Sequence, residues 1–178
     1  MIFICAAALY GQTPQPKGLE TQWEIAPVLQ EIADYSAQLL PLLDKIDVHP
    51  WVEKGASDTY AAQLQSSKEQ ARALTAQAKD LAASPERLGV SLQVLFRIQA
   101  LESMLASLGE GVRRYQGAAD AQALATAAGR NGAARERLKQ YIVNLAAERE
   151  QDLAVMDREA QRCRGVLTQA PPKTTRKR

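Results

Sequence analysis

Few side chains in this sequence could bind a metal or act as a nucleophile. His49 is the single histidine, and Cys5 and Cys163 are the two cysteines. Zinc and haem sites need several such ligands at short spacings, and no CxxC, CxxCH or HExxH motif is present. Glu-x-x-His pairs for a di-iron bundle and a GxxxxGK phosphate loop are missing as well. We therefore predict no cofactor, no metal and no catalytic role.

Cys163 is a candidate nucleophile whose neighbours in the sequence are charged. Arg162 and Arg164 flank it in the sequence and would favour the thiolate if they lie close to the sulfur. If Cys5 is removed with a signal segment, Cys163 is left unpaired, which makes a dimer linked through Cys163 one hypothesis. The alternative, which we favour, is that Cys163 is a small apolar core residue near a helix end.

Trp51 is one of two tryptophans and lies between the helix breakers Pro50 and Gly55. It could be an exposed anchor for a partner or a glycan. It could also close one end of a helical bundle with its indole group bonded to a carbonyl, and we favour this second interpretation.

The positive charge of the chain is concentrated at its end. We expect residues 169–178 to be a disordered basic tail that contacts an anionic surface or another envelope protein, or that only aids solubility. Its four bases are Lys173, Arg176, Lys177 and Arg178. Residues 19–170 hold 17 bases against 20 acids. Such a weakly acidic body argues against a nucleic-acid partner.

The first eleven residues, MIFICAAALYG, carry no charge and suit the apolar part of a secretory signal. They are too short to span a bilayer as a helix. No base precedes the apolar run, so the true start codon could lie upstream. A buried N-terminal strand or helix turn is the alternative. With signal removal after Ala8 or Gly11, the protein is exported to the periplasm or the medium, and residues 12–21 form a disordered leader.

Apolar residues recur at alternating spacings of 3 and 4 through most of residues 22–168, which is typical of amphipathic helices. Such helices, joined by short breaks, predict an all-α, antiparallel four-helix-type bundle with one short extra helix. The expected helices cover residues 22–46, 58–83, 85–115, 118–129 and 132–165.

Four details of this bundle are specific enough to check. Pro41 should kink or split the first helix near Leu40. Ser84 should cap the third main helix, with Pro85 at its first position. That third helix should form the centre of the core. Its apolar stripe includes Leu101, and Phe96 and Met104 widen the stripe. The apolar stripe of the last helix should be interrupted at Arg149, which is expected at the rim of the core. It should then resume with Leu153, Met156, Ala160 and Cys163.

Two stretches of sequence suggest relatives. The first is Trp51-Val52-x-Lys54-Gly55-Ala56 with Tyr60, and the second runs from Met156 to Arg164 as MDREAQRCR. Together they resemble secreted helical proteins of soil bacteria that have no known activity. The resemblance implies export and a helical fold, and no functional residues.

Two classes of function fit these observations. The first is a structural or interaction protein of the cell envelope. The second is a small-ligand binder with a pocket between the helices at 22–46 and 58–83. We expect the contact between these two helices to bury little apolar area.

Overall fold

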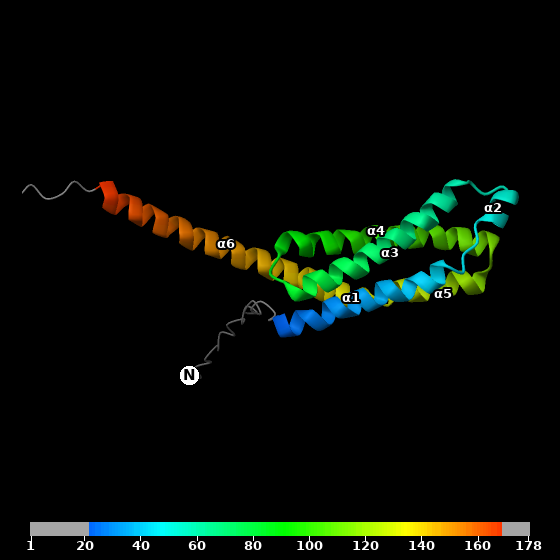
Figure 1. Ribbon diagram of the computed structural model, residues 1–178, viewed down its shortest axis with the longest axis horizontal. Coiled ribbons are helices and arrows are strands. Elements are labelled where there is room, and N and C mark those ends of the chain that lie inside the picture. The colour runs from blue at the N-terminus through cyan, green and yellow to red at the C-terminus, as the bar shows by residue number, and fades with distance from the viewer. Residues whose placement is uncertain (1–21, 169–178) are drawn as a thin grey trace, which may run out of the picture.

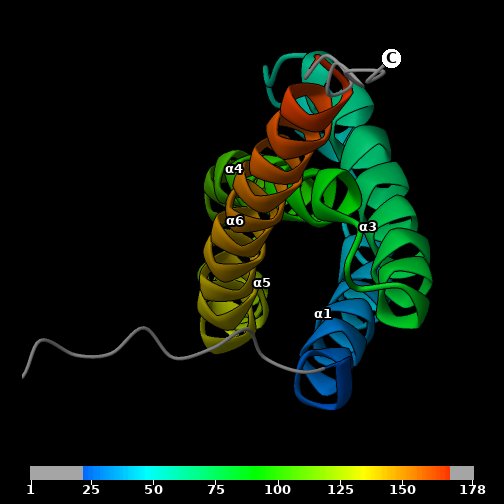
Figure 2. The ribbon, with the colours of Figure 1, turned by 90° about the vertical axis from the view of Figure 1, so that its left-hand side faces the viewer.

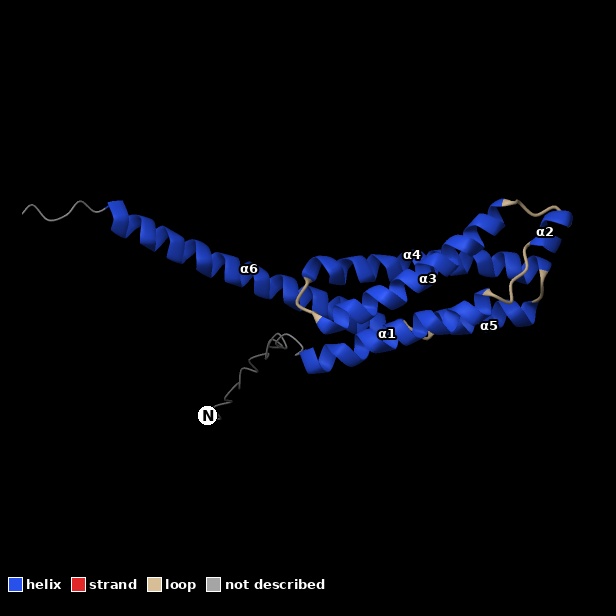
Figure 3. Ribbon diagram, viewed as in Figure 1, coloured by secondary structure: helices blue, strands red, loops and turns tan. Residues whose placement is uncertain are grey.

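The computed structural model describes residues 22–168 of the chain, and all six elements in this range are helices (Figure 3). They are α1 (Gln22–Leu43), α2 (His49–Glu53), α3 (Thr59–Ala83), α4 (Leu88–Tyr115), α5 (Ala118–Gly129) and α6 (Gly132–Thr168). The expected all-α class is confirmed. The expected signal segment, leader and basic tail lie outside the described residues.

The helices form an antiparallel four-helix arrangement whose fourth member is divided. Helices α1, α3 and α4 follow one another up and down the bundle, and α5 and α6 then return end to end along α4 (Figure 1). Viewed along the bundle, α1 and α3 lie on one side, and α4, α5 and α6 on the other (Figure 2). The expected short extra helix is α5, and it forms the first part of the fourth member of the bundle.

Helices α1 and α3 make the most extensive contact in the bundle. Small residues line this contact, and Ala33, Ala71 and Ala78 are fully buried. Ser67 is buried as well, and its hydroxyl donates to the carbonyl of Gln63 in its own helix at 2.9 Å. The Ala-rich stripe of α3 thus allows close approach of the two backbones, as its composition indicates.

Trp51 closes the end of the bundle, as we expected, and is not an exposed anchor, although within residues 22–168 its indole N–H does not make the expected bond to a carbonyl. It lies on α2, a short helix that the sequence did not suggest, and is 2% exposed. Its indole ring stacks on Tyr115 with a centroid separation of 5.8 Å and meets the edge of Tyr60 at 5.5 Å. Trp51 is therefore a structural residue.

Two predictions about helix ends are wrong. Of the two effects expected of Pro41, a kink or a split, the split near Leu40 is wrong, because Pro41 lies in the last turn of α1 and the helix continues to Leu43. Ser84 does not cap α4: its N–H bonds to the carbonyl of Leu81 and ends α3. Residues 84–87 then form a turn before Leu88. This turn uses the carbonyl of Pro85 as the acceptor for the Tyr141 hydroxyl at 2.8 Å.

Helix α4 belongs to the core, with Leu101 and Ile98 fully buried, and it contacts α3, α5 and α6. Phe96 was expected on the buried apolar face of this helix, but its side chain is 60% exposed. The buried positions of α4 recur at Val94, Ile98, Leu101, Leu105 and Leu108, and Phe96 lies outside them.

Candidate functional site

The most unusual feature of the fold is the second half of α6. This helix has 37 residues, against 28 for α4, and is about 55 Å long. Its first half packs against α1 and α4, and its second half extends beyond the bundle, where none of the other described helices lies beside it (Figures 1 and 2). We call residues 146–168 the arm.

One apolar stripe runs along both halves of α6. In the bundle it is buried, with Leu138 and Leu145 at 0% exposure. In the arm the same face is open to solvent, with Leu153 at 64% and Met156 at 66%. The expectation that Leu153, Met156, Ala160 and Cys163 continue the core is therefore wrong. The bundle helices end before they can cover these residues.

The arm carries its charges in two blocks. Residues 146–157 contain four acids and one base, and residues 158–166 contain three bases and one acid. Two ion pairs lie along the arm: Arg149 with Asp152 at 3.6 Å, and Arg162 with Glu159 at 3.0 Å. Both are exposed pairs three residues apart, so they contribute little to stability. Arg149 is exposed and does not form a buried ion pair, but it lies on the arm beyond the bundle and not at the rim of the core, where we expected it.

Cys163 lies on the stripe of the arm, and its side chain is exposed. The favoured interpretation as a buried core residue is therefore wrong. Trp51 is not near Cys163: it is buried on α2, which lies at the end of the bundle away from the arm (Figure 1). The expected basic tail lies outside the described residues.

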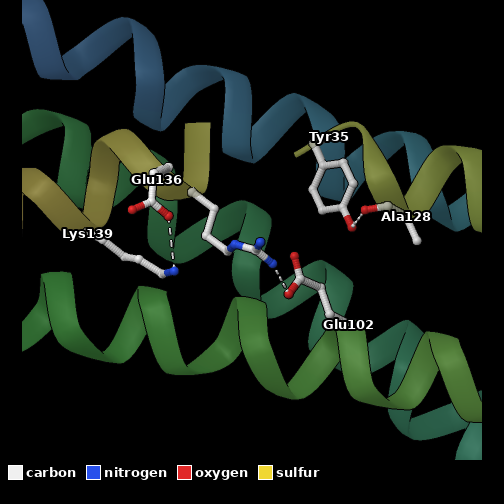
Figure 4. Close-up of polar contacts among 6 residues, drawn as sticks. Tyr35, Glu102, Ala128, Glu136 and Lys139 are labelled. Carbon is white, nitrogen blue, oxygen red and sulfur yellow. Dashed lines mark hydrogen bonds and ion pairs between the residues drawn. The ribbon is translucent and has the colours of Figure 1, made fainter. Parts of the chain in front are cut away.

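A second polar feature lies within the bundle, where α1, α4 and the start of α6 meet (Figure 4). Arg135 forms an ion pair with Glu102, and both side chains are partly buried. The hydroxyl of Tyr35 donates to the carbonyl of Ala128 at 3.2 Å. Burial and, to a smaller extent, the Glu102 carboxylate raise the pKa of Tyr35 to about 12. These contacts fix α1 and α4 to the junction between α5 and α6.

Asn131 lies beside this cluster at the start of α6. Its carbonyl accepts the first helical hydrogen bond, from the N–H of Arg135. Its side chain is 1% exposed, and neither Nδ2 nor Oδ1 has a hydrogen-bond partner. An open pocket of about 470 Å³ lies next to it, lined mainly by α1 residues that include Glu31 and Asp34. This pocket is the best candidate for a small-molecule site, although it is lined by α1 and residues 130–131 and not by α3.

The base of the arm is acidic. Burial, followed by the carboxylates of Glu86 and Glu148, raises the pKa of Tyr141. Glu86 belongs to the turn between α3 and α4, and Glu148 to the first turn of the arm. The arm therefore begins among carboxylates and ends among guanidinium groups.

Within residues 22–168, no group of three or more His, Cys, Asp and Glu side chains is arranged to hold a metal ion. His49 is exposed at the start of α2. No described helix is both long enough and apolar enough to cross a membrane.

Comparison with protein-family models, with curated proteins and with solved structures finds no match for this chain.

The sequence did not single out the arm as a surface, because its stripe has the same period as the buried stripes. One signal was available. The expected last helix was longer than the helices that could cover it, and its apolar residues beyond their reach have no partner among the other described helices.

Proposed function

We propose that this chain is a structural or interaction protein of the cell envelope and that the arm is its contact surface. One observation carries the proposal: the stripe that is buried at Leu145 continues into solvent at Leu153 and Met156. Contiguous exposed apolar surface that is rimmed by charge is typical of protein–protein contact sites. The proposed role is binding and not catalysis.

The place of action in this proposal is the periplasm or the outside of the cell. It rests on the uncharged apolar run at residues 2–9 and on the resemblance to secreted helical proteins. Amino-terminal sequencing of the protein from periplasmic and culture fractions tests it. We expect a mature chain that begins after Ala8 or Gly11, whereas a chain that keeps Met1 in the cytoplasm would overturn export.

Several partners fit an envelope protein with such an arm. The exposed thiol of Cys163 makes a second copy of the chain one of them. Another envelope protein could bind the same stripe, and an anionic surface could bind the basic tail.

The proposal is tested by capturing partners from envelope extracts with matched baits. The unmodified chain and a Val155→Glu variant should capture the same partner, because Val155 is exposed on the face opposite the stripe. A Leu153→Glu, Met156→Glu double variant should lose it. Equal capture by all three baits would show that the arm is not the contact surface.

The pocket beside Asn131 supports a second candidate function, the binding of a small polar ligand. Glu31, Asp34 and Arg130 at the pocket would suit a ligand with both a cationic and an anionic group. However, the unpartnered amide atoms of Asn131 are out of contact with solvent, so a ligand would reach them only after the site rearranges. Thermal unfolding with a panel of amino acids and polyamines tests this candidate. A stabilisation that disappears in Glu31→Gln, Asp34→Asn would support it.

A further inference from the structure

We propose that the partner of the arm is the arm of a second copy of this chain and that the two pair as an antiparallel coiled coil. The inference rests on the proposed function and names the partner. It is carried by three features of α6: the period of its stripe, the position of the bundle beside it, and the order of its charges.

The stripe of the arm has the spacing of a coiled-coil seam. From Ile142 onward the intervals are 4, 3, 4, 3, 4 and 3 residues, which is the a/d pattern of a heptad repeat. The seam residues are Ile142, Ala146, Arg149, Leu153, Met156, Ala160 and Cys163. Ile142 is buried in the bundle, whereas the seam from Arg149 to Cys163 is exposed. The arm thus offers an exposed seam about two heptads long that no other helix within residues 22–168 covers.

The position of the bundle decides the orientation of the second helix. The seam lies on the same face of α6 as Leu138 and Leu145. In the first half of α6, α1 and α4 pack against this face. Paired helices lie 8–10 Å apart. A parallel partner would bring its own α6 and bundle into the space that α1 and α4 already fill. An antiparallel partner runs the other way, and the two bundles lie at opposite ends of the pair.

The length of the arm matches this arrangement. A register that sets Met156 opposite Ala160 of the second copy places Leu153 opposite Cys163 and puts the two-fold axis near Arg158. The end of α6 at Thr168 then lies opposite Glu148. That position is directly beyond Leu145, the last fully buried residue of the helix. Each arm therefore covers the exposed seam of the other and stops where the bundle begins.

The charge order favours the same orientation. Antiparallel pairing sets the acidic half of each arm against the basic half of the other, and Glu150 lies beside Arg164 of the second copy. The acids of the arm begin sixteen residues after Gly132, too far along the helix to be explained by its dipole, whose effect is confined to the first turn. Parallel pairing would place Arg149 directly against itself within the seam. Asp157 of one chain lies beside Asp157 of the second copy near the two-fold axis, and the repulsion between these two carboxylates weakens the dimer.

The first experiment is sedimentation of the full chain under reducing conditions over a range of concentrations. We expect a reversible monomer–dimer equilibrium. Leu153→Glu with Met156→Glu should weaken dimerisation at least about tenfold, since both side chains lie at the centre of the seam. Val155→Glu adds the same kind of charge on the opposite face and should leave the equilibrium unchanged. All these side chains are exposed in the monomer, so helical content should not change.

The second experiment tests the orientation by exchanging charges. Glu150→Arg and Arg164→Glu should each weaken the dimer, because each creates two like-charged pairs. The double variant should recover the affinity, since it restores both pairs with their signs reversed. Recovery is specific to antiparallel pairing, because the two residues are fourteen positions apart and lie beside each other only when the helices run in opposite directions.

The third experiment uses disulfide formation in a Cys5→Ser chain. In the antiparallel dimer, the two Cys163 residues are about 15 Å apart along the helix axis, beyond the reach of a disulfide. Mild oxidation should therefore leave most Cys163 reduced. A Leu153→Cys variant should cross-link rapidly, with its new thiol joined to Cys163 of the second copy.

The outcomes separate this inference from the proposed function. A chain that stays monomeric at its highest soluble concentration, or rapid cross-linking of Cys163 to itself, would overturn antiparallel self-pairing. If a different protein is then captured by the Val155→Glu bait and not by the seam variant, the proposed function stands and only the identity of the partner changes. Failure of both experiments would remove the arm as a contact surface.

Discussion

Gly111 of α4 lies against the edge of the Trp51 indole. A Cβ atom at this position would come within 2.9 Å of Trp51 Cζ3 and 2.8 Å of Tyr60 Cε1. Both contacts are shorter than side-chain carbons tolerate, so only glycine allows α4 to approach this aromatic group. Glycine at position 111 is therefore required for the closed end of the bundle.

Two glycines of α4 make a matched test of this contact. Gly111→Ala should lower the free energy of unfolding by about 1–3 kcal/mol, the usual cost of overpacking a core. Gly109 has open space around its Cα, so Gly109→Ala should raise the free energy of unfolding by up to about 1 kcal/mol through helix propensity. Urea unfolding measures both. Stabilisation by both substitutions would mean that Trp51 is free to move away.

The packing of α4 in the core is tested at Leu101, which is fully buried. Leu101→Ala should destabilise the protein by about 2–5 kcal/mol, because it removes buried surface and leaves a cavity. Phe96, on an exposed face of the same helix, is the control. Phe96→Ala should change stability by less than about 0.5 kcal/mol. A larger loss at Phe96 than at Leu101 would refute the orientation of α4.

The buried faces of the helices could be predicted from the sequence because they depend on local periodicity. The stripes through Leu39, Leu74 and Leu101 have the predicted spacing, and all three residues are buried. Periodicity says nothing of what lies opposite a stripe, and so Leu145 and Leu153 had the same sequence signal and opposite environments. Whether a helix has a neighbour depends on the lengths of all the others.

Contacts between distant segments were also beyond prediction. Glu102 and Arg135 are 33 residues apart, and their pairing depends on how far α6 is shifted along α4. That shift is set by the turn at residues 116–117 and by the whole length of α5. The buried amide of Asn131 has the same origin, since its surroundings come from several helices.

The phenol of Tyr35 makes stability depend on pH in the alkaline range. Its pKa is raised from 10.0 to about 12 by burial and by Glu102. The unfolded chain therefore loses this proton first, and the stabilisation is complete below pH 10 and lost as the pH rises to about 12. The loss amounts to roughly 2–3 kcal/mol for a shift of this size.

Unfolding free energies measured from pH 8 upward should therefore decline above pH 10. Tyr35→Phe removes the titrating group and should give a flatter decline. Some slope should remain, because the pKa of Tyr141 is raised as well. Parallel curves for the two proteins would show that Tyr35 is ionised equally easily in the folded and unfolded chains.

The last prediction concerns the tail, which carries four bases within the final six residues, Lys173 to Arg178. Two prolines, Pro171 and Pro172, precede these bases and favour an extended chain. Each base near an anionic membrane is worth about 1 kcal/mol, and the attraction is screened beyond about 8 Å at physiological salt. The full chain should bind vesicles containing anionic lipid more tightly than a chain that ends at Ala170. The difference should fade as salt is added, and neutral vesicles should bind neither protein. A third chain, with glutamine at the four basic positions, keeps the length of the tail and should behave like the shortened one. Equal binding by all three proteins at low salt would leave the tail with no role at anionic surfaces.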